Sequence, residues 1–401
     1  MGLPRLQAAT MAGIDMTTIV INAVSVREGG ALVVLRELLA VMTLLRPDWH
    51  WHVTTNVAAR PQLPAFNNTH FHVYPESQLA GWRIRYWYET ELRSLVFETG
   101  ADLLFSQTNY LPLRTLPCPS LLLIQHAGHF SRLFCELTEQ KLTSYLAILG
   151  WRMKGYWVRA SAKRATCLIV QTKALALDIS KATGMELSTI TVIAHGSGIL
   201  ASDKQLPALP QRSQPLRVGY ISKAGVQKNF NVLLAAAAQL QQKNVDLVLV
   251  LTLDPGKQEN QDVLALAQQL GVATLVENHG ELDHAAIKSL YRSLHCFVFA
   301  SLCESFGFPL VEAMACGLPL CIADTASNRE VAGGAADVFA ANDAAALAGM
   351  LARLIDEPLW YELQARRSLA RAAAFSWELA AARTLLLIES LAPPRAAMPT
   401  P

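Results

Sequence analysis

Short apolar runs alternate with longer segments of helical periodicity along most of this chain. The short runs are rich in Val, Ile, Leu and Phe and predict buried strands, whereas the longer segments repeat apolar residues every three or four positions, as on one helix face. Strands that alternate with helices are typical of a parallel sheet covered by helices. The predicted strands are residues 17–23, 51–55, 71–74, 102–106, 121–125, 166–172, 190–194, 216–222, 247–252, 276–282, 296–300 and 320–324.

The helical segments fall between these strands and after the last of them. Ser376 is a suitable N-cap for the final helix, because its hydroxyl can accept a hydrogen bond from a free backbone N–H of the first turn. We expect helices at residues 81–98, 141–164, 287–294, 310–315, 344–355, 359–374 and 376–390.

A polar stretch divides the pattern into two halves. At 401 residues the chain is too long for one ordinary core, so we expect two domains. Residues 201–215 are rich in Pro, Gln, Ser and Lys and predict a linker between domains at 17–200 and 216–375. A separate helix is expected at 376–392, and disordered ends at 1–16 and 393–401.

Composition narrows the class of protein. Charged residues make up 16 % of the chain and the net charge is +2, which gives no support for nucleic-acid binding. The seven cysteines lack metal-ligand spacing and indicate a reduced, cytoplasmic setting. No run of eighteen apolar residues predicts a membrane span, and the first sixteen residues do not read as a signal peptide.

The stretch from Glu304 to Glu312 carries the strongest chemical signal. It follows an apolar strand and contains Gly307 and Pro309 just before a helical segment, so backbone N–H groups from Gly307 to Leu310 are expected at a helix N-terminus, where phosphate oxygens bind well. Carboxylates repel phosphate but accept hydrogen bonds from sugar hydroxyls, so the two glutamates suggest a nucleotide sugar. Alternatively, Glu304 caps the helix and Glu312 is a solvated helix residue.

Three further loops follow predicted strands. Gly29 and Gly30 let the backbone approach a ligand closely, or form a plain tight turn. Lys223 and Lys228 lie in a glycine-containing loop and either bind a diphosphate or are ordinary surface lysines. His126 directly follows the strand predicted at 121–125, and His129 lies three residues further along the chain. Ligands of parallel sheets bind at this carboxyl end of the strands.

The segment Glu-Ser-Phe-Gly-Phe-Pro-Leu-Val-Glu-Ala-Met-Ala-Cys-Gly-Leu-Pro, beginning at Glu304, resembles the signature of the retaining glycosyltransferases of glycosyltransferase family 4. The resemblance implies an α/β fold of the GT-B type, with two Rossmann-like parallel-sheet domains facing each other across a cleft and a C-terminal helix that returns to the first domain. It implies catalytic roles for Glu304, Lys228 and His126. The donor-binding residues are expected to be Gly29, Gly30, Lys223, Ser305, Phe306, Gly307, Phe308, Pro309, Leu310 and Glu312.

Two positions depart from the family pattern. An Arg normally precedes the diphosphate-binding Lys, but Ser222 stands six residues before Lys228, and Lys223 is the nearest cation. Lys lacks the bidentate fork of Arg, so this substitution alters the expected phosphate geometry. Ala127 follows His126 where the family usually has Asp.

The resemblance implies transfer of a sugar from a UDP- or GDP-sugar to a glycan or lipid-linked acceptor, in bacterial polysaccharide or lipopolysaccharide synthesis. No Asp-x-Asp pair occurs, so we expect neither metal nor cofactor. Basic and aromatic residues within 141–164 suggest peripheral contact with an anionic membrane, or else a solvated helix face. A nucleotide-sugar epimerase or a non-catalytic scaffold of the same fold is the alternative.

Overall fold

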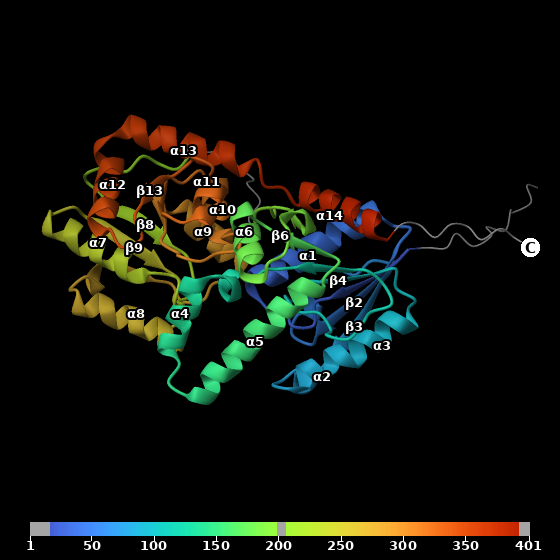
Figure 1. Cartoon of the computed structure of the whole chain (residues 1–401). Coiled ribbons are helices and arrows are strands. Elements are labelled where there is room, and N and C mark those ends of the chain that lie inside the picture. Colours follow the sequence, from blue (N-terminus) through green and yellow to red (C-terminus); the bar gives the residue numbers. More distant parts are fainter. Residues whose placement is uncertain (1–16, 199–205, 393–401) are drawn as a thin grey trace, which may run out of the picture.

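The computed structural model describes residues 17–198 and 206–392, which form two domains with one parallel sheet each (Figure 1). The first sheet has the order β3-β2-β1-β4-β5-β6-β7. Its strands are β1 (Thr18–Asn22), β2 (His50–Asn56), β3 (Thr69–Tyr74), β4 (Leu103–Ser106), β5 (Ser120–Leu123), β6 (Cys167–Val170) and β7 (Ile190–Val192).

The second sheet repeats this arrangement with six strands in the order β10-β9-β8-β11-β12-β13. In both sheets the sequence order reverses beside the first strand of the domain, which opens a crevice at the carboxyl ends of the strands. The strands are β8 (Leu216–Tyr220), β9 (Leu247–Leu251), β10 (Val276–Asn278), β11 (Cys296–Phe299), β12 (Leu320–Ala323) and β13 (Asp337–Phe339).

Helices cover both faces of each sheet, as the nearly continuous apolar character of the central strands requires. The first domain contains α1 (Gly29–Leu45), α2 (Arg83–Glu89), α3 (Glu91–Glu98), α4 (Arg132–Lys141), α5 (Tyr145–Arg164) and α6 (Lys173–Thr183). The second contains α7 (Phe230–Gln242), α8 (Gln258–Gln269), α9 (His284–Arg292), α10 (Phe308–Ala315), α11 (Ala326–Ala332), α12 (Ala344–Asp356) and α13 (Pro358–Ala372). Short 3₁₀ turns lie at Arg60–Gln62, Glu76–Gln78, Ala127–Phe130, Leu187–Thr189 and Ala273–Leu275.

The last helix, α14 (Trp377–Leu391), leaves the second domain and packs against α1 of the first (Figure 1). Trp377, Ala381 and Ile388 lie in the same core cluster as β1. The Ser376 hydroxyl accepts a hydrogen bond from the Leu379 N–H, which confirms it as the N-cap. Burial of this apolar helix face ties the two domains together.

The α/β, GT-B fold class is confirmed. Two predicted helices are wrong in their extent: one is broken in two, and the other begins later than predicted. The helix expected at 81–98 is broken at Thr90 into α2 and α3, where the Thr90 hydroxyl bonds the Tyr86 carbonyl. The one expected at 141–164 begins only at Tyr145, because Ser144 is extended as an N-cap residue. Ser and Thr compete with the helix backbone for hydrogen bonds and favour such breaks.

Parts of three other predictions fall outside the described residues. These are the disordered ends at 1–16 and 393–401 and the part of the linker at 201–205. The remaining linker residues pack on the second domain, where the Tyr361 hydroxyl donates to the Ala208 carbonyl at 3.0 Å. All seven cysteines are free thiols. Among the described helices, none combines the length and apolar character needed to span a bilayer.

Candidate active site

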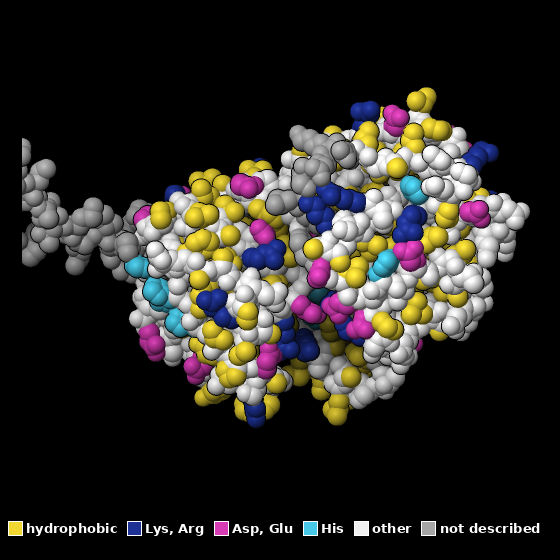
Figure 2. Space-filling view, turned by 180° about the vertical axis from the view of Figure 1, so that it is seen from behind, with side chains coloured by type: hydrophobic (Ala, Val, Ile, Leu, Met, Phe, Trp, Pro, Cys, Tyr) yellow, Lys and Arg dark blue, Asp and Glu magenta, His cyan; other side chains and the backbone are white. Residues whose placement is uncertain are grey.

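A cavity of about 620 Å³ lies between the two domains. Figure 2 shows the molecule hollowed there, with acidic and basic side chains gathered along the groove. The first domain contributes the segment from Glu28 to Val33, and the second contributes Lys223, the segment from Glu304 to Pro309 and Glu312. The structure thus brings most of the predicted donor-binding residues around one space; Lys228 and His126 lie next to it rather than in its wall.

Glu304 and Lys228 form an ion pair at this cavity. The Lys228 Nζ lies 2.5 Å from the Glu304 Oε1, and both side chains are only 15 % exposed. The Ser301 hydroxyl donates to the same oxygen at 2.6 Å, which leaves Oε2 without a protein donor among the described residues. The Lys228 backbone is itself fixed, since its carbonyl accepts from the Tyr220 hydroxyl at 2.6 Å. The carboxylate is therefore held in one orientation beside a fixed positive charge.

The N-terminus of α10 faces the same cavity. Gly307 is the N-cap in a left-handed conformation, with φ of 86°, and Pro309 lies in the first turn. The Leu310 N–H donates to the Gly307 carbonyl at 2.9 Å, so the expectation that this amide is free is wrong. Within the described residues no acceptor bonds the N–H of Gly307 or Phe308. These two amides, and the positive end of the helix dipole, are available to an anion.

Glu312 lies on α10 and lines the same cavity as Glu304. Its Oε2 accepts a hydrogen bond from the Tyr291 hydroxyl at 3.0 Å, and its other oxygen faces the backbone at Gly198. Burial raises the pKa of Glu312 to about 7, although the Tyr291 hydrogen bond opposes this shift. The carboxyl group therefore changes charge near neutral pH, unlike an ordinary surface glutamate.

The side chains between the two glutamates join the domains rather than face a ligand. The Ser305 hydroxyl donates to the Gln125 carbonyl at 2.7 Å, and the Ser305 carbonyl accepts from Thr172 at 3.2 Å. Phe306 and Phe308 are 5.3 Å apart and both pack against His195. In the arrangement seen here, Ser305 and Phe306 can contact a donor chiefly through their backbone.

Lys223 is already paired with carboxylates from both domains. Its Nζ lies 2.9 Å from Glu28 of the first domain and 3.2 Å from Glu281 of the second. The hydrogen bond from Lys223 lowers the pKa of Glu28. Lys223 lines the cavity, but a diphosphate would have to compete with these two acids for it. The replacement of the missing Arg by Lys223 stays a prediction.

Gly29 and Gly30 begin α1 at the opposite wall. Gly29 has a φ of 66°, which favours glycine, and has open space around it. Gly30 is in contact with the Phe308 ring, because a Cβ built on Gly30 would lie 2.9 Å from the Phe308 Cδ2. The close approach expected at Gly30 is therefore made by the second domain in this structure.

His126 follows β5 and lies near the ion pair. Part of the His126 side chain is accessible to solvent. Burial of the rest lowers the pKa of His126; the positive charge of Lys228 lowers it further, and the negative charge of Glu304 raises it. The neutral imidazole is 5.8 Å, ring to ring, from His129. His129 stacks on Trp151 at 4.1 Å and is buried, so it serves the core of the first domain rather than the cavity.

Gln171 after β6 and His195 after β7 are among the cavity residues that were not predicted. Both are buried, and their polar side-chain atoms have no hydrogen-bond partner among the described residues. Their position directly after parallel strands is the one signal that the sequence offered. No three His, Cys, Asp or Glu side chains of the described chain are grouped as a metal site requires.

Two parallel-sheet domains with a carboxylate and a helix N-terminus in the cleft define a GT-B fold whose cleft has the chemistry to hold an anionic, hydroxyl-rich ligand. Residues 202–374 match the family model of the glycosyl transferases group 1. This match covers the second domain and agrees with the resemblance carried by the segment from Glu304 to Glu312.

Curated relatives match over part of their length. O-antigen chain mannosyltransferase B of Escherichia coli is 36 % identical over 96 residues, which are 24 % of this chain and 25 % of the relative. The MMP alpha-(1->4)-mannosyltransferase of Mycolicibacterium hassiacum is 31 % identical over 179 residues, 43 % of each chain. The matched region thus spans less than half of these relatives.

Solved structures share the fold over nearly the whole chain. Sucrose-phosphate synthase of Thermosynechococcus elongatus superposes with a TM-score of 0.71 at 19 % identity, covering 94 % of this chain and 99 % of that one. Anabaena HepE, solved with UDP and glucose, superposes with a TM-score of 0.69 at 18 % identity, covering 94 % and 100 %. At these identities the likeness shows the fold alone.

Proposed function

We propose that this protein is a retaining, metal-independent glycosyltransferase that uses a UDP- or GDP-sugar. The observation that carries the proposal is the Glu304–Lys228 pair next to the free N–H groups that begin α10. A carboxylate that accepts from sugar hydroxyls and a helix N-terminus that binds phosphate, side by side in one cleft, match the two halves of a nucleotide sugar.

In the reaction, the bond between the anomeric carbon and the diphosphate oxygen breaks, and a bond from that carbon to the acceptor oxygen forms. The acceptor proton leaves with the nucleoside diphosphate. Lys228 and the amides of Gly307 and Phe308 stabilise the negative charge that develops on the diphosphate. Glu304 orients the sugar, Glu312 accepts from the ribose, and closure of the cleft excludes water that would otherwise hydrolyse the donor.

Proteins similar to this chain support a nucleotide-sugar donor and a glycan acceptor. A mannosyltransferase of O-antigen chains and a UDP-bound structure are among the proteins similar to this chain. We therefore propose a cytoplasmic role in bacterial surface-polysaccharide synthesis, with a glycan or lipid-linked acceptor.

The test is a transfer assay with UDP- and GDP-sugars and lipid-linked acceptors, with and without EDTA. We expect turnover that EDTA does not change, and a product whose anomeric configuration by NMR equals that of the donor. Loss of activity in EDTA, or an inverted product, would contradict the corresponding part of the proposal. Conversion of the donor without an acceptor would indicate an epimerase, and nucleotide binding without turnover would indicate a scaffold.

Peripheral membrane contact is a second part of the proposal and rests on two helices of the first domain. On α5 the side chains of Tyr145 and Tyr156 are 78 % and 69 % exposed, and beside α2 Trp82 is 73 % exposed. Arg83, Arg85 and Lys154 accompany these aromatics. Aromatic side chains mixed with cations suit an anionic lipid surface, each cation contributing about 1 kcal/mol. Sedimentation with phosphatidylglycerol vesicles at low salt tests this; a protein that remains in the supernatant would contradict it.

A further inference from the structure

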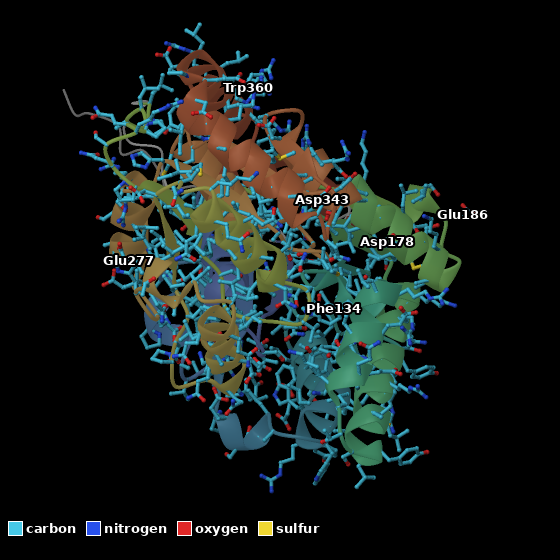
Figure 3. All side chains as sticks on the ribbon, turned by 90° about the vertical axis from the view of Figure 1, so that its left-hand side faces the viewer. Phe134, Asp178, Glu186, Glu277, Asp343 and Trp360 are labelled. Carbon is cyan, nitrogen blue, oxygen red and sulfur yellow. The ribbon has the colours of Figure 1, made fainter. Side chains whose placement is uncertain are left out.

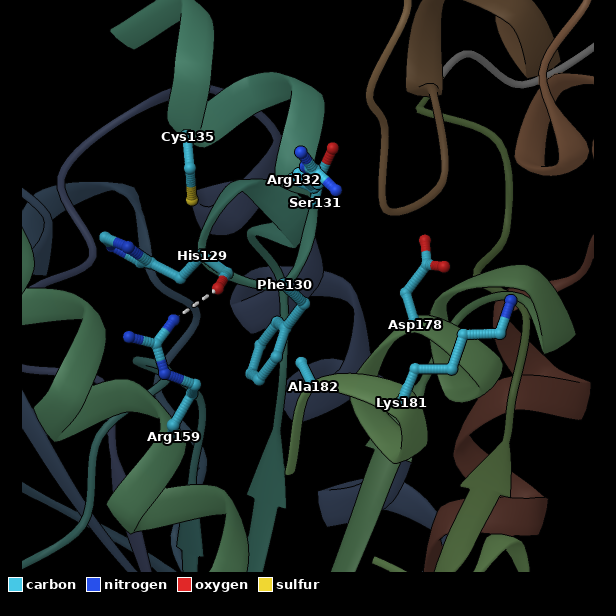
Figure 4. Close-up of a pocket in the computed structure, with 9 residues that line it drawn as sticks. All are labelled: His129, Phe130, Ser131, Arg132, Cys135, Arg159, Asp178, Lys181 and Ala182. Atoms are coloured by element: carbon cyan, nitrogen blue, oxygen red, sulfur yellow. Dashed lines mark hydrogen bonds between the residues drawn. The ribbon is translucent and has the colours of Figure 1, made fainter. Parts of the chain in front are cut away.

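A second cavity, of about 430 Å³, opens in the first domain between α4, α5 and α6 (Figure 4). Its wall includes Ser131 and Arg132 at the start of α4, Arg159 of α5, and Asp178 and Lys181 of α6. None of these residues has a role in the donor site described above.

Cations dominate this wall. Arg159 donates one hydrogen bond, from Nη1 to the His129 carbonyl at 2.9 Å, and its other N–H groups have no acceptor among the described residues. Lys181 has no carboxylate within 4.0 Å anywhere in the described chain. Arg132 pairs with Glu136 at 2.7 Å, but it is 93 % exposed, and an exposed pair of this kind is weak. Three guanidinium or ammonium groups thus border one space.

Asp178 adds a hydrogen-bond acceptor to these cations. Figure 4 shows Asp178 extending from α6 toward the opening beside the start of α4, and Lys181 extending from the same helix on the other side of Asp178. A carboxylate accepts from sugar hydroxyls, whereas guanidinium and ammonium groups bind phosphate or carboxylate. The combination fits a ligand that carries both hydroxyls and a negative charge.

The cavity adjoins the reacting end of the donor site. Cys303, which precedes Glu304, packs against the core cluster of the first domain. Burial raises the pKa of the Cys303 thiol, the Ser131 hydroxyl lowers it, and the Asp178 carboxylate raises it further. The charge of Glu304 raises the pKa of His126 and so opposes the effect of burial. The His126 ring lies 5.8 Å from the ring of His129, which lines this cavity, and 5.3 Å from the ring of Phe134.

Phe134 and Asp178 lie at the middle of the molecule in Figure 3, where the helices of the first domain face the second domain. A ligand held here would lie on the first-domain side of Cys303, the residue before Glu304.

We propose that this cavity binds the acceptor through an anionic group, a phosphate or a carboxylate, carried near the hydroxyl that receives the sugar. Arg132, Arg159 and Lys181 bind the anion, and Asp178 accepts from an acceptor hydroxyl. The proposal rests on the proposed function, since only a transferase needs an acceptor, and it adds the charge class of that acceptor.

The test uses three probes that share one sugar and one alkyl chain: octyl glucoside, octyl glucoside 6-phosphate and octyl glucuronide. Binding to the full chain is measured by calorimetry with UDP or GDP at saturation, so that the donor site is filled. We expect at least one anionic probe to bind tenfold or more tightly than the neutral one. Comparison of the phosphate with the glucuronide identifies which anion the cavity prefers.

Lys181→Glu and Arg132→Glu are the test variants, and Lys163→Glu is the control, because Lys163 is an exposed lysine of α5 that does not line the cavity. We expect both test variants to lose the anionic preference by tenfold or more and to keep the nucleotide affinity. The control should retain the preference.

Equal binding of all three probes, or equal losses in the test and control variants, would overturn the inference. Failure of the proposed function gives a different result: no sugar is transferred from any donor, while the binding preference of the cavity can still be measured. Transfer to neutral acceptors with unchanged KM in Lys181→Glu would leave the proposed function intact and reject the anionic acceptor.

Discussion

The two walls of the central cleft differ in how they are built. The wall of the second domain consists of fixed charges and directed hydrogen bonds: Glu304 accepts from Lys228 and Ser301, and Glu312 accepts from Tyr291. The wall of the first domain presents the glycine backbone at Gly29 and Gly30 and the buried side chains of Gln171 and His195, and its charged residue Glu28 is paired with Lys223 of the second domain. The oriented charges next to Glu304 come from the second domain, whereas the first domain chiefly contributes shape and access.

This difference predicts that substitutions in the second domain affect chemistry and that substitutions in the first domain affect fit. A charged group that acts in the transition state contributes more than a contact surface does. The following experiments test the contrast, beginning with the largest expected effect.

Glu304→Gln should lower kcat by about 10²–10³-fold, the scale seen when one oriented electrostatic group is lost. Gln keeps an oxygen that can accept from Lys228 and Ser301, so circular dichroism and the melting temperature should change little. Glu281→Gln is the control, because Glu281 lines the same cavity but is 52 % exposed and pairs with Lys223. Near-normal turnover in Glu304→Gln, or an equal loss in Glu281→Gln, would contradict the role of Glu304.

Glu312→Gln should remove a pH dependence of donor binding. Because the pKa of Glu312 is raised to about 7, most of the group is protonated at pH 6 and ionised at pH 8. Only the ionised form accepts from both ribose hydroxyls, so affinity should rise about tenfold over this range, the ratio of ionised fractions. A nucleotide sugar is the ligand of choice, since its diphosphate has no terminal phosphate that titrates near pH 6.

The sign for stability is opposite to that for binding. The folded-state pKa of Glu312 lies above the 4.5 of an ordinary glutamate, so its contribution to the free energy of unfolding is largest in acid and is lost as the pH rises through about 7. The Gln variant should therefore unfold with a smaller decline between pH 5 and 8. A pH profile of binding that is identical in the wild type and Glu312→Gln would reject this assignment.

The sequence was most informative where one local pattern determines the geometry. The strand before Ala300, Gly307 in its left-handed conformation and Pro309 in the first turn together produce the N-terminus of α10, and each of these features is visible in the sequence. The same holds for Ser376 as an N-cap. In these places neighbouring residues alone specify the conformation.

Tertiary contacts explain what the sequence did not indicate. The pairing of Lys223 with Glu28 joins positions 195 residues apart, and no spacing rule connects them. The Phe308 ring contacts Gly30 across the boundary between the two domains, and the two residues are far apart in the sequence. The pKa of Glu312 depends on its burial, which a helical pattern with alternating exposure does not reveal.

Gly30→Ala should have the smallest effect and should change fit rather than chemistry. A Cβ would lie 2.9 Å from the Phe308 Cδ2, so the ring must move and the cleft should close less completely. We expect donor KM to rise by about two- to fivefold with kcat retained, the scale of a packing change of about 0.5–1 kcal/mol. Stability should not fall, because Ala is favoured over Gly by roughly 0.5–1 kcal/mol within a helix.

Gly29→Ala is the matched control for this contact. Gly29 has open space around it but a φ of 66°, so Ala there should lower the free energy of unfolding by about 1 kcal/mol and leave donor KM unchanged. The two neighbouring variants thus separate contact across the cleft from backbone strain within the first domain. If Gly30→Ala lowered kcat as strongly as Glu304→Gln, the first-domain wall would take part in the chemistry and the contrast between the two walls would be wrong.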